Sequence, residues 1–480
     1  MNHSTAPLLP IAICLMTGIA IARWWMPGFP LPIVLLATIV VALATYRWPG
    51  VQSMSIYVCC MMLGMTLMQL RHDVSDDELL NRELEAVVMS EPAERPKTIG
   101  VDLLVPKAGG RTLRCYLWKD ELSGEIRLGD ELVVRGEASR QGSAPLFFIE
   151  RNNWHPGGKA LNQLSRWQRL RLWFLKQRHK LLEHYQDFNA EADTYAVLAA
   201  MTLGDKSAQT QELRETYAVS GAAHVLAISG LHVGIVYMLI TFFMFGRRRF
   251  WLSQVLTVSA IWAFALLTGL SPSVTRAATM ISIYAVFSAR GGRASGVNVL
   301  CFAAIVILVT DVRSLFDVGF QLSFASVLAI LAFMPQLQGL YQPQNILLRW
   351  TWNLGLLSVC AQLGVAPLIT YYFGRISIYF LLSNFLVIPA ATLILYGSLI
   401  SLLFPPASIV VIHIVKAMNG GLRIIASLPG ASIEGLHPTP LQVALIYVFI
   451  LLCYLIFRKL ISFFRSSINM HDRRWLSPRG

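Results

Sequence analysis

Long apolar runs separated by short polar connections make up most of the chain. The runs lie at 8–22, 31–46, 51–70, 224–245, 252–270, 274–289, 298–310, 314–334, 351–372, 378–403, 408–427 and 441–457. A helix needs about 20 apolar residues to cross a bilayer, and several of these runs are shorter. The pattern therefore predicts a mainly α, polytopic helical membrane protein with about 10–12 transmembrane helices. The first run is too long and too poorly marked for cleavage to be a signal peptide, so we interpret it as a retained helix.

The pattern changes between residues 71 and 186, where charged residues are frequent. Segments of strand length that alternate or run apolar lie at Glu83–Met89, Thr98–Val105, Arg111–Trp118, Glu131–Glu137 and Leu146–Glu150. Gly109-Gly110 suits a hairpin turn, and Leu128-Gly129-Asp130 suits the turn into a barrel strand. Five strands in roughly 75 residues predict a small OB-like β-barrel.

One predicted barrel strand carries a weak candidate surface for nucleic acid. OB barrels bind single strands through aromatic stacking and basic side chains. The candidate residues are Arg114, Tyr116, Trp118 and Lys119. Acidic residues such as Asp120 and Glu121 interrupt this basic patch, so the barrel either binds the strand or only organises the outer mouth of the protein.

A basic amphipathic segment covers residues 159–190. It combines arginines and lysines with Trp167, Leu170, Trp173 and Phe174 at helical spacing. Such a helix is typical of the membrane interface, where the apolar face is buried among lipids. A basic helix also gathers phosphates. We favour the membrane role, and the two roles are compatible.

The residues from His224 to Gly234 read HVLAISGLHVG and place polar groups inside an apolar run. Ser229-Gly230 predicts a helix break, because Ser caps a new helix and Gly tolerates any backbone angle. The exposed N–H groups of that new helix attract anions. A Gly-kinked packing helix whose histidines are hydrogen-bonded explains the same residues equally well.

This block and four other segments resemble the ComEC family, the competence channel that admits single-stranded DNA across the bacterial inner membrane. The other segments are Leu203-Gly204-Asp205-Lys206 followed by Tyr217 and Gly221, Pro272 through Ala277, Asp317 through Phe324, and Asn384 through Pro389. They occur in the family's order and cover about 190–460. The OB-like domain is also what the family carries at this place.

The sequence pattern and the resemblance together divide the chain into five parts. These are N-terminal transmembrane helices (1–71), an OB-like extracytoplasmic domain (72–158), a basic amphipathic interfacial helix (159–190), a competence-type transmembrane channel domain (191–460) and a basic cytoplasmic tail (461–480). Many relatives carry a further C-terminal domain that resembles metallo-β-lactamases, with a His-x-His-x-Asp-His metal motif. That motif does not occur in these 480 residues. We therefore expect a form without this domain, with any nuclease role in another protein or in sequence missing here.

Composition agrees with a membrane protein. Hydrophobic residues make up 55% of the chain and charged residues only 14%, which is typical of integral membrane proteins. Lys and Arg set the orientation: Arg247-Arg248-Arg249, Arg290, Arg293, Arg349 and the tail from Arg458 fall on one side if every run spans. We expect that side to be cytoplasmic, in a bacterial inner (plasma) membrane, with the OB-like domain outside. The net charge of +13 reflects this topology signal and is weak support for a nucleic-acid partner.

Polar residues inside the spans suggest a pathway. A charged residue at the bilayer centre costs about 2.5–3.5 kcal/mol on insertion scales. Lys416 and Arg423 fall at spacings that align them on one helix face, which suits either a wet anion pathway or a basic face in water. Arg276 is either a snorkelling anchor or a phosphate contact, and the resemblance favours the pathway. Gln321 is more typical of packing between helices.

We interpret the protein as an inner-membrane channel for single-stranded DNA during natural transformation. The predicted pathway residues are His224, Ser229, Gly230, His232, Gly234, Arg276, Gln321, Lys416 and Arg423. We expect no cofactor and no metal, since the seven cysteines show no metal spacing. The expected partners are single-stranded DNA, membrane lipid, a periplasmic DNA-binding competence protein, a cytoplasmic motor or single-strand-binding protein, and a separate nuclease.

Two other function classes remain open at this point. Broken helices and midplane polar groups also suit a secondary transporter for a smaller anion. A membrane-embedded hydrolase is less favoured, because the two histidines are eight residues apart and Ser229 lacks a Gly-x-Ser-x-Gly setting. We therefore expect a transport protein and not an enzyme.

Overall fold

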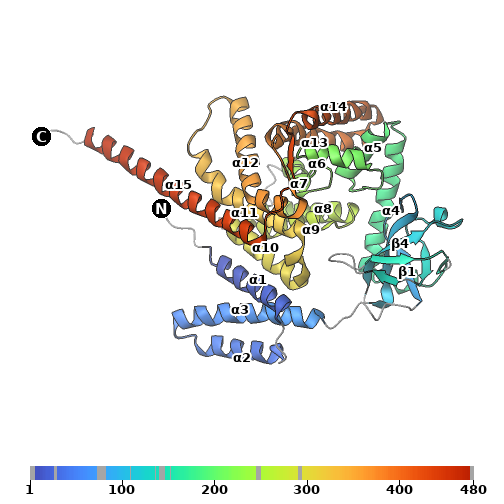
Figure 1. Cartoon of the computed structure of the whole chain (residues 1–480), viewed down its shortest axis with the longest axis horizontal. Coiled ribbons are helices and arrows are strands. Elements are labelled where there is room, and N and C mark those ends of the chain that lie inside the picture. The colour runs from blue at the N-terminus through green and yellow to red at the C-terminus, as the bar shows by residue number, and fades with distance from the viewer. Residues whose placement is uncertain are drawn as a thin grey trace. The chain divides into compact units, whose positions relative to one another are not determined.

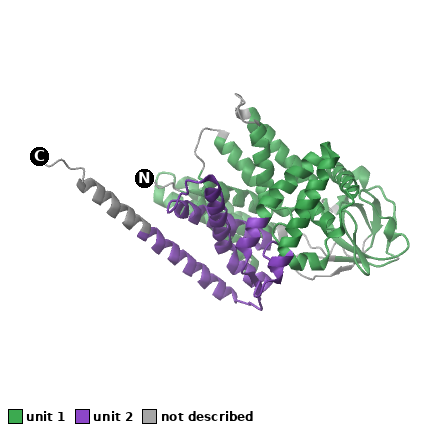
Figure 2. Ribbon diagram, turned by 90° about the horizontal axis from the view of Figure 1, so that it is seen from above, with its two compact units in different colours: residues 1–217, 223–315, 387–422 green, residues 218–222, 316–386, 423–480 purple. Residues whose placement is uncertain are grey.

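The computed structural model describes residues 6–25, 30–72, 83–108, 110–135, 137–139, 146–151, 153–244, 250–289 and 295–475. Gly109 of the predicted hairpin turn, Arg247 to Arg249, Arg290, Arg293 and the residues after Trp475 lie outside these ranges. The chain forms two compact units (Figure 2). Unit 1 holds residues 1–217, 223–315 and 387–422, and unit 2 holds 218–222, 316–386 and 423–480.

Three helices open unit 1: α1 (Leu8–Trp24), α2 (Leu31–Ala44) and α3 (Pro49–His72) (Figure 1). Two glycines let α1 and α3 approach closely. A Cβ at Gly18 would lie 2.0 Å from the Met61 carbonyl oxygen, and one at Gly64 would lie 2.5 Å from the Leu15 carbonyl oxygen. Small residues at such crossings are typical of helix pairs in membranes, where close backbone packing replaces the hydrophobic effect.

A small curled sheet follows. Its strands are β1 (Leu84–Val88), β2 (Ala93–Glu94), β3 (Thr98–Val105), β4 (Arg111–Trp118), β5 (Glu131–Val134), β6 (Glu137–Ser139), β7 (Leu146–Ile149) and β8 (Trp154–Pro156). The order is β6-β7-β4-β3-β1-β5-β8, with β2 paired to β3. The long β3–β4 pair is antiparallel from Thr98 opposite Trp118 to Val105 opposite Arg111, whereas β4 and β7 are parallel. The OB-like domain predicted from the alternating pattern is confirmed.

The interior of this domain is formed by alternating side chains. Val101, Leu103, Leu117 and Ile149 are among the buried residues of one apolar cluster. The predicted turn before β5 is also present: Gly129 has a φ of +92°, a conformation that favours glycine. The three short strands β2, β6 and β8 were not predicted, because two or three residues carry too little periodicity.

Helix α4 (Arg166–Gln186) packs against the sheet domain (Figure 1). It begins with a reciprocal capping box in which Ser165 and Gln168 bond each other's backbone N–H. Leu172 and Leu175 join an apolar cluster with Val87, Met89 and Leu104 of the sheet. The predicted amphipathic helix therefore exists, but part of its surface is covered by protein.

The remaining elements are helical apart from one short ribbon. The helices are α5 (Ala192–Thr202), α6 (Gln211–Val219), α7 (Gly230–Met244), α8 (Phe250–Leu267), α9 (Pro272–Ala289), α10 (Gly296–Thr310), α11 (Val318–Gln338), α12 (Ile346–Phe373), α13 (Phe380–Leu403), α14 (Ser408–Ser427) and α15 (Pro440–Trp475). The ribbon pairs β9 (Arg375–Ser377) with β10 (Ser432–Glu434). Every predicted apolar run overlaps a helix, although α7 begins six residues later than its run and α11 begins four residues later.

Six helices in the described ranges are long and apolar enough to cross a membrane, and five shorter apolar helices accompany them. The predicted polytopic helical fold is confirmed, and the count of about 10–12 spans stays a prediction. In unit 2, α11 and α12 pack closely, since a Cβ at Gly364 would lie 2.5 Å from the Ala325 carbonyl oxygen. Helix α15 runs on to Trp475, so the first part of the predicted tail continues the last helix.

Candidate nucleic-acid interface

The predicted helix break at Ser229-Gly230 is present. Residues 222–229 are not helical, and α7 begins at Gly230. The His232 side chain reaches back to the break: its Nδ1 accepts the Ser229 N–H at 3.1 Å and lies 3.1 Å from the Ser229 hydroxyl. His232 thus takes the place that Glu or Gln takes in a capping box, where the third helical residue satisfies the N–H of the cap.

The two histidines have different surroundings. His224 is exposed, whereas His232 is 0% exposed. The flanking Ile228 and Val233 belong to an apolar cluster. The His232 Nε2 has no hydrogen-bond partner in the described part of the chain. The expectation that both imidazoles line a wet pathway is therefore not met by His232, because its role in fixing the start of α7 buries the ring.

The surroundings of the other predicted pathway residues differ from one residue to the next. Arg276 is 7% exposed near the start of α9. Gln321 accepts a hydrogen bond from the Tyr372 hydroxyl at 2.7 Å, which is the packing role favoured above. A Cβ would meet no atom within 4 Å at Gly234 and only the Ala277 Cβ, at 3.7 Å, at Gly230. Close packing against other residues therefore does not explain why glycine occupies either position.

Helix α14 turns its basic face outward. Lys416 forms an ion pair with Glu191 at 2.7 Å, and Arg423 is exposed. The opposite face of the helix is buried: Val411, Val415, Met418 and Leu422. Both basic residues thus lie on the exposed face of α14, and the choice between a basic face in water and an anion pathway stays a prediction.

The weak candidate surface on β4 is largely occupied. Tyr116 is 8% exposed, because its ring stacks on Phe148 at 5.5 Å and lies under the Arg95 guanidinium at 4.7 Å. Lys119 pairs with Glu94 at 3.2 Å. Trp118 keeps an exposed ring, so it is the member of this set that offers a face for base stacking.

Arg114 instead belongs to a large cleft in unit 1, which we call the basic cleft. It has a volume of about 1030 Å³. Its walls come from the sheet domain, from α4, from the 204–214 segment, from the non-helical residues 223–227 and from the 269–272 loop. Its charged lining consists of Arg95, Arg114, Arg171, Arg178, Lys206, Arg214, Glu91, Glu94, Asp102 and Asp205.

The carboxylates of the basic cleft already have partners. Asp102 lies 3.8 Å from the Arg114 Nε, and Glu94 pairs with Lys119. Glu91 contacts the His179 Nδ1 at 3.1 Å, and Asp205 accepts a hydrogen bond from the Ser207 hydroxyl. Six cations thus face four carboxylates that are engaged with neighbours, which leaves the cleft electropositive.

Two arginines of α4 are the most informative members. Arg178 is 6% exposed, and the Nε atoms of Arg171 and Arg178 have no hydrogen-bond partner among the residues that the structure describes. Burial lowers the pKa of Arg171. Buried guanidinium groups are costly unless a partner compensates them. An anion in the cleft would supply that partner.

Other charged groups of the cleft also have shifted pKa values. Burial lowers the pKa of Lys206, and the nearby charges of Arg214 and Arg114 lower it further. Burial also raises the pKa of Glu91, against the opposing effect of His179 and Arg178. Burial is thus the main cause of these shifts, and repulsion between neighbouring cations adds to it for Lys206.

Three of the sequence motifs meet at this cleft. Gly204 has a φ of +76°, and a Cβ there would lie 3.1 Å from the Thr268 carbonyl oxygen. The Gln209 side chain donates to the Leu226 carbonyl oxygen at 3.0 Å, which ties the 204–214 segment to the HVLAISG stretch. Pro272 of the third motif also lines the cleft. Sequence reasoning found the motifs but not their meeting point.

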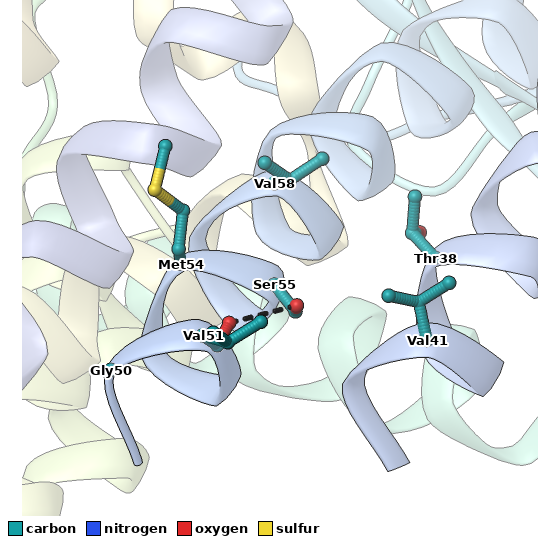
Figure 3. A pocket seen from close by; sticks show the side chains of 7 residues that line it. All are labelled: Thr38, Val41, Gly50, Val51, Met54, Ser55 and Val58. Carbon is teal, nitrogen blue, oxygen red and sulfur yellow. Dashed lines mark hydrogen bonds between the residues drawn. The ribbon is translucent and has the colours of Figure 1, made fainter. Parts of the chain in front are cut away.

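A second hollow of unit 1 is chemically different. It lies between α2 and α3, has a volume of about 490 Å³ and is lined mainly by Val41, Val51, Met54 and Val58 (Figure 3). The Ser55 hydroxyl within it donates to the Val51 carbonyl oxygen at 2.9 Å. Such a surface suits apolar contacts and offers nothing to an anion.

Comparison with known proteins identifies the family. A model described as competence protein matches residues 201–460. The chain belongs to this family. ComE operon protein 3 of Bacillus subtilis is 32% identical over 204 residues, which cover 42% of this chain and 25% of that protein. Competence protein ComA of Neisseria gonorrhoeae is 28% identical over 150 residues, 29% of this chain and 21% of the relative.

An uncharacterised Escherichia coli protein, YcaI, is 26% identical over 211 residues, 42% of this chain and 28% of that protein. The matches thus span about a quarter of the length of these relatives. No solved structure matches the chain. The resemblance to ComEC-type competence proteins is confirmed, and the basic cleft lies partly in the matched region and partly in the sheet domain before it.

Proposed function

We propose that this competence-family protein is a channel that conducts single-stranded DNA across the inner membrane into the cytoplasm, and that the basic cleft receives the strand. The observation that carries the proposal is the pair Arg171 and Arg178, which line the cleft and whose Nε atoms have no hydrogen-bond partner among the described residues; Arg178 is buried and Arg171 is half-buried. Arginine binds phosphate through several N–H groups at once. The uptake role of relatives is consistent with a phosphate-bearing polymer as the ligand.

The shape of the cleft supports a polymer. Its lining comes from five separate segments of unit 1 and includes residues of three family motifs. Cations on opposite walls can contact successive phosphates of one strand, and each contact releases counterions. We place the sheet domain at the outer mouth, where α4 delivers the strand to the motif loops.

Translocation requires an energy source outside the residues named here. Moving one elementary charge through 100 mV costs about 2.3 kcal/mol, so a strand of phosphates enters a negative cytoplasm uphill. We propose a cytoplasmic motor or a single-strand-binding protein that traps the emerging strand. A periplasmic DNA-binding competence protein that delivers DNA, and a nuclease that supplies the single strand, complete the proposed set of partners.

Reconstituted transport tests the function. The purified full chain is placed in liposomes that contain a single-strand-binding protein, and protection of labelled oligonucleotide from external nuclease is measured. We expect uptake of single strands and loss of uptake in the Arg171→Ala/Arg178→Ala variant. Lys416→Ala is the matched control, because Lys416 is a basic residue with an exposed ion pair, and it should transport normally.

Two outcomes would overturn the proposal. Passage of phosphate or small organic anions without passage of oligonucleotide would favour a secondary transporter. Cleavage of the oligonucleotide by the purified chain would favour a hydrolase. Arg276→Ala and His232→Ala extend the test to the motif residues: we expect both to reduce uptake while protein remains in the membrane, Arg276 by contact and His232 through the start of α7.

A further inference from the structure

Unit 2 contains a polar pocket that none of the channel residues above explains. It lies where α11 turns into α12 and has a volume of about 430 Å³, which is in the range of sites for small ligands. The pocket is formed by the last turn of α11, the connecting loop and the first turns of α12. Its principal lining residues are Gln338, Tyr341, Gln344, Arg349, Trp352 and Asn353.

Two aromatic rings form one wall of this pocket. Tyr341 and Trp352 meet edge to face, with ring centroids 5.5 Å apart and planes at 89°. Both side chains are well exposed, at 51% for Tyr341 and 37% for Trp352. An edge-to-face pair covers little of either π surface, so each ring keeps a face on which a flat ligand can stack.

Carboxamide side chains form the other wall. The Gln338 Nε2 donates to the Asn353 Oδ1 at 3.2 Å, which holds both amides in place. That bond uses one donor and one acceptor, and in the described ranges it leaves the Gln338 Oε1 and an Asn353 amide N–H for a ligand. Adjacent amide donors and acceptors match the edge of a nucleobase, as amides do in base recognition.

The charge of the pocket also suits a nucleotide. Arg349 lines it, and no Asp or Glu occurs in the sequence between Asp317 and Glu434. The guanidinium is therefore not neutralised by a carboxylate of the hairpin, in contrast to the engaged acids of the basic cleft. Arg349 can hold the phosphate that follows a base stacked on Trp352.

From the edge-to-face rings, the paired amides and the arginine that has no carboxylate in its hairpin, we propose that the α11–α12 hairpin is a second binding site of the protein, specific for an unstacked nucleobase of a single strand and its phosphate. The predicted orientation places Arg349 on the cytoplasmic side, so the site would hold the strand as it leaves the channel. The proposal rests on the proposed function for the presence of the strand, but its binding chemistry is separate from that of the cleft.

Photocrosslinking can locate bound bases on the full chain. The purified protein in phosphatidylcholine nanodiscs is mixed with an oligothymidylate that carries 5-iodouracil, irradiated and digested, and the attached peptides are mapped by mass spectrometry. We expect attachment at Tyr341 or Trp352 and, separately, near the basic cleft. Unlabelled oligothymidylate should compete at both places. An abasic oligomer of equal length should compete only at the cleft, because the cleft contacts phosphates and the hairpin contacts bases.

Two tryptophans offer a matched pair of variants. Trp350 is exposed but does not line the pocket, whereas Trp352 does. Trp352→Ala should lower apparent affinity at the hairpin about tenfold or more, as expected for loss of a stacking platform. Trp352→Phe should restore most of it, and Trp350→Ala should leave it unchanged. Gln338→Leu should lower it less, while attachment at the cleft stays normal in every case.

The outcomes separate this proposal from the proposed function. Attachment at the cleft without attachment at the hairpin overturns the second site and leaves the channel standing. No attachment anywhere, together with no liposome uptake, overturns the channel. Equal losses in Trp350→Ala and Trp352→Ala, or displacement by phosphatidylglycerol with no preference for bases, would make the rings a membrane-interface belt and end the proposal.

Discussion

Helices α4 and α14 have the same kind of amphipathic sequence, but α4 places two of its basic residues on its inward face, whereas α14 places its basic residues outward. Both combine basic residues with apolar residues at helical spacing. In α4 the inward face holds Arg178 and part of Arg171, while Trp167 and Trp173 are exposed. In α14 the inward face is mainly apolar, with Asn419 as a buried polar residue, and Lys416 is on the surface with Glu191.

The difference between the two helices shows that burial changes how a basic side chain affects stability. An exposed lysine that pairs with one carboxylate is an ordinary surface ion pair, worth about 0–1 kcal/mol. A buried arginine with an unpaired donor is destabilising unless a partner compensates it. The exposed tryptophans of α4 still suit the predicted membrane interface. Helix α4 can therefore contact lipid with one face and the strand with the other, whereas the basic residues of α14 lie on its exposed face.

The largest expected effect separates the two helices by affinity. Arg171→Ala/Arg178→Ala should weaken oligonucleotide binding by about a hundredfold, since a charge-assisted hydrogen bond contributes about 1.5–3 kcal/mol. The salt dependence of binding should fall by about 0.7 for each lost phosphate contact. Fluorescence anisotropy at several salt concentrations measures both. An unchanged slope would place the strand elsewhere.

The next prediction concerns the buried face of α14. The Tyr217 hydroxyl donates to the Asn419 Oδ1 at 2.6 Å, and both residues are buried. Tyr217→Phe leaves the Asn419 oxygen without this donor, so we expect a loss of about 1–3 kcal/mol in stability. Thermal unfolding in detergent measures the loss. Oligonucleotide affinity should stay the same, and a drop in affinity would contradict the division of roles.

A smaller effect concerns the acid side of the basic cleft. Because burial raises the pKa of Glu91, this carboxylate becomes neutral at a higher pH than an ordinary Glu. Lowering the pH from about 7 to about 5 should then strengthen oligonucleotide binding a few-fold. The Glu91→Gln variant has a neutral side chain at this position at every pH. It should therefore bind the oligonucleotide more tightly than the unmodified protein at pH 7, and its affinity should change less with pH. The difference between the pH profiles of the two proteins reports Glu91.

The smallest expected effect is on the exposed ion pair of α14. Lys416→Ala removes its contact with Glu191, and we expect a change in stability of about 0–1 kcal/mol. Oligonucleotide affinity should not change. If Lys416→Ala lost as much oligonucleotide affinity as the α4 double variant, α14 would belong to the anion pathway and the contrast between the two helices would be wrong.

Parts of the fold were accessible from the sequence because they rest on local patterns. The bounds of β3 and β4 follow from alternating residues, and every apolar run overlaps a helix. Ser229-Gly230 marked the start of α7 through the ordinary preferences of caps and glycine. The meeting of Arg95 with Tyr116 was not accessible, because a cation 21 positions away covers the ring only after β2, β3 and β4 have paired.

The amino-acid sequence alone determined the family, the helical membrane fold, the OB-like domain and the amphipathic character of α4 and α14, since periodicity and motif spacing are local properties. Only the tertiary structure decided that His232 is buried, that Lys416 is on the surface and that Arg171 and Arg178 share a cleft with three distant motifs. Burial and charge neutralisation depend on which segments pack together. Whether a guanidinium anchors the fold or binds a ligand depends on its neighbours in the tertiary structure, and no local sequence pattern identifies those neighbours.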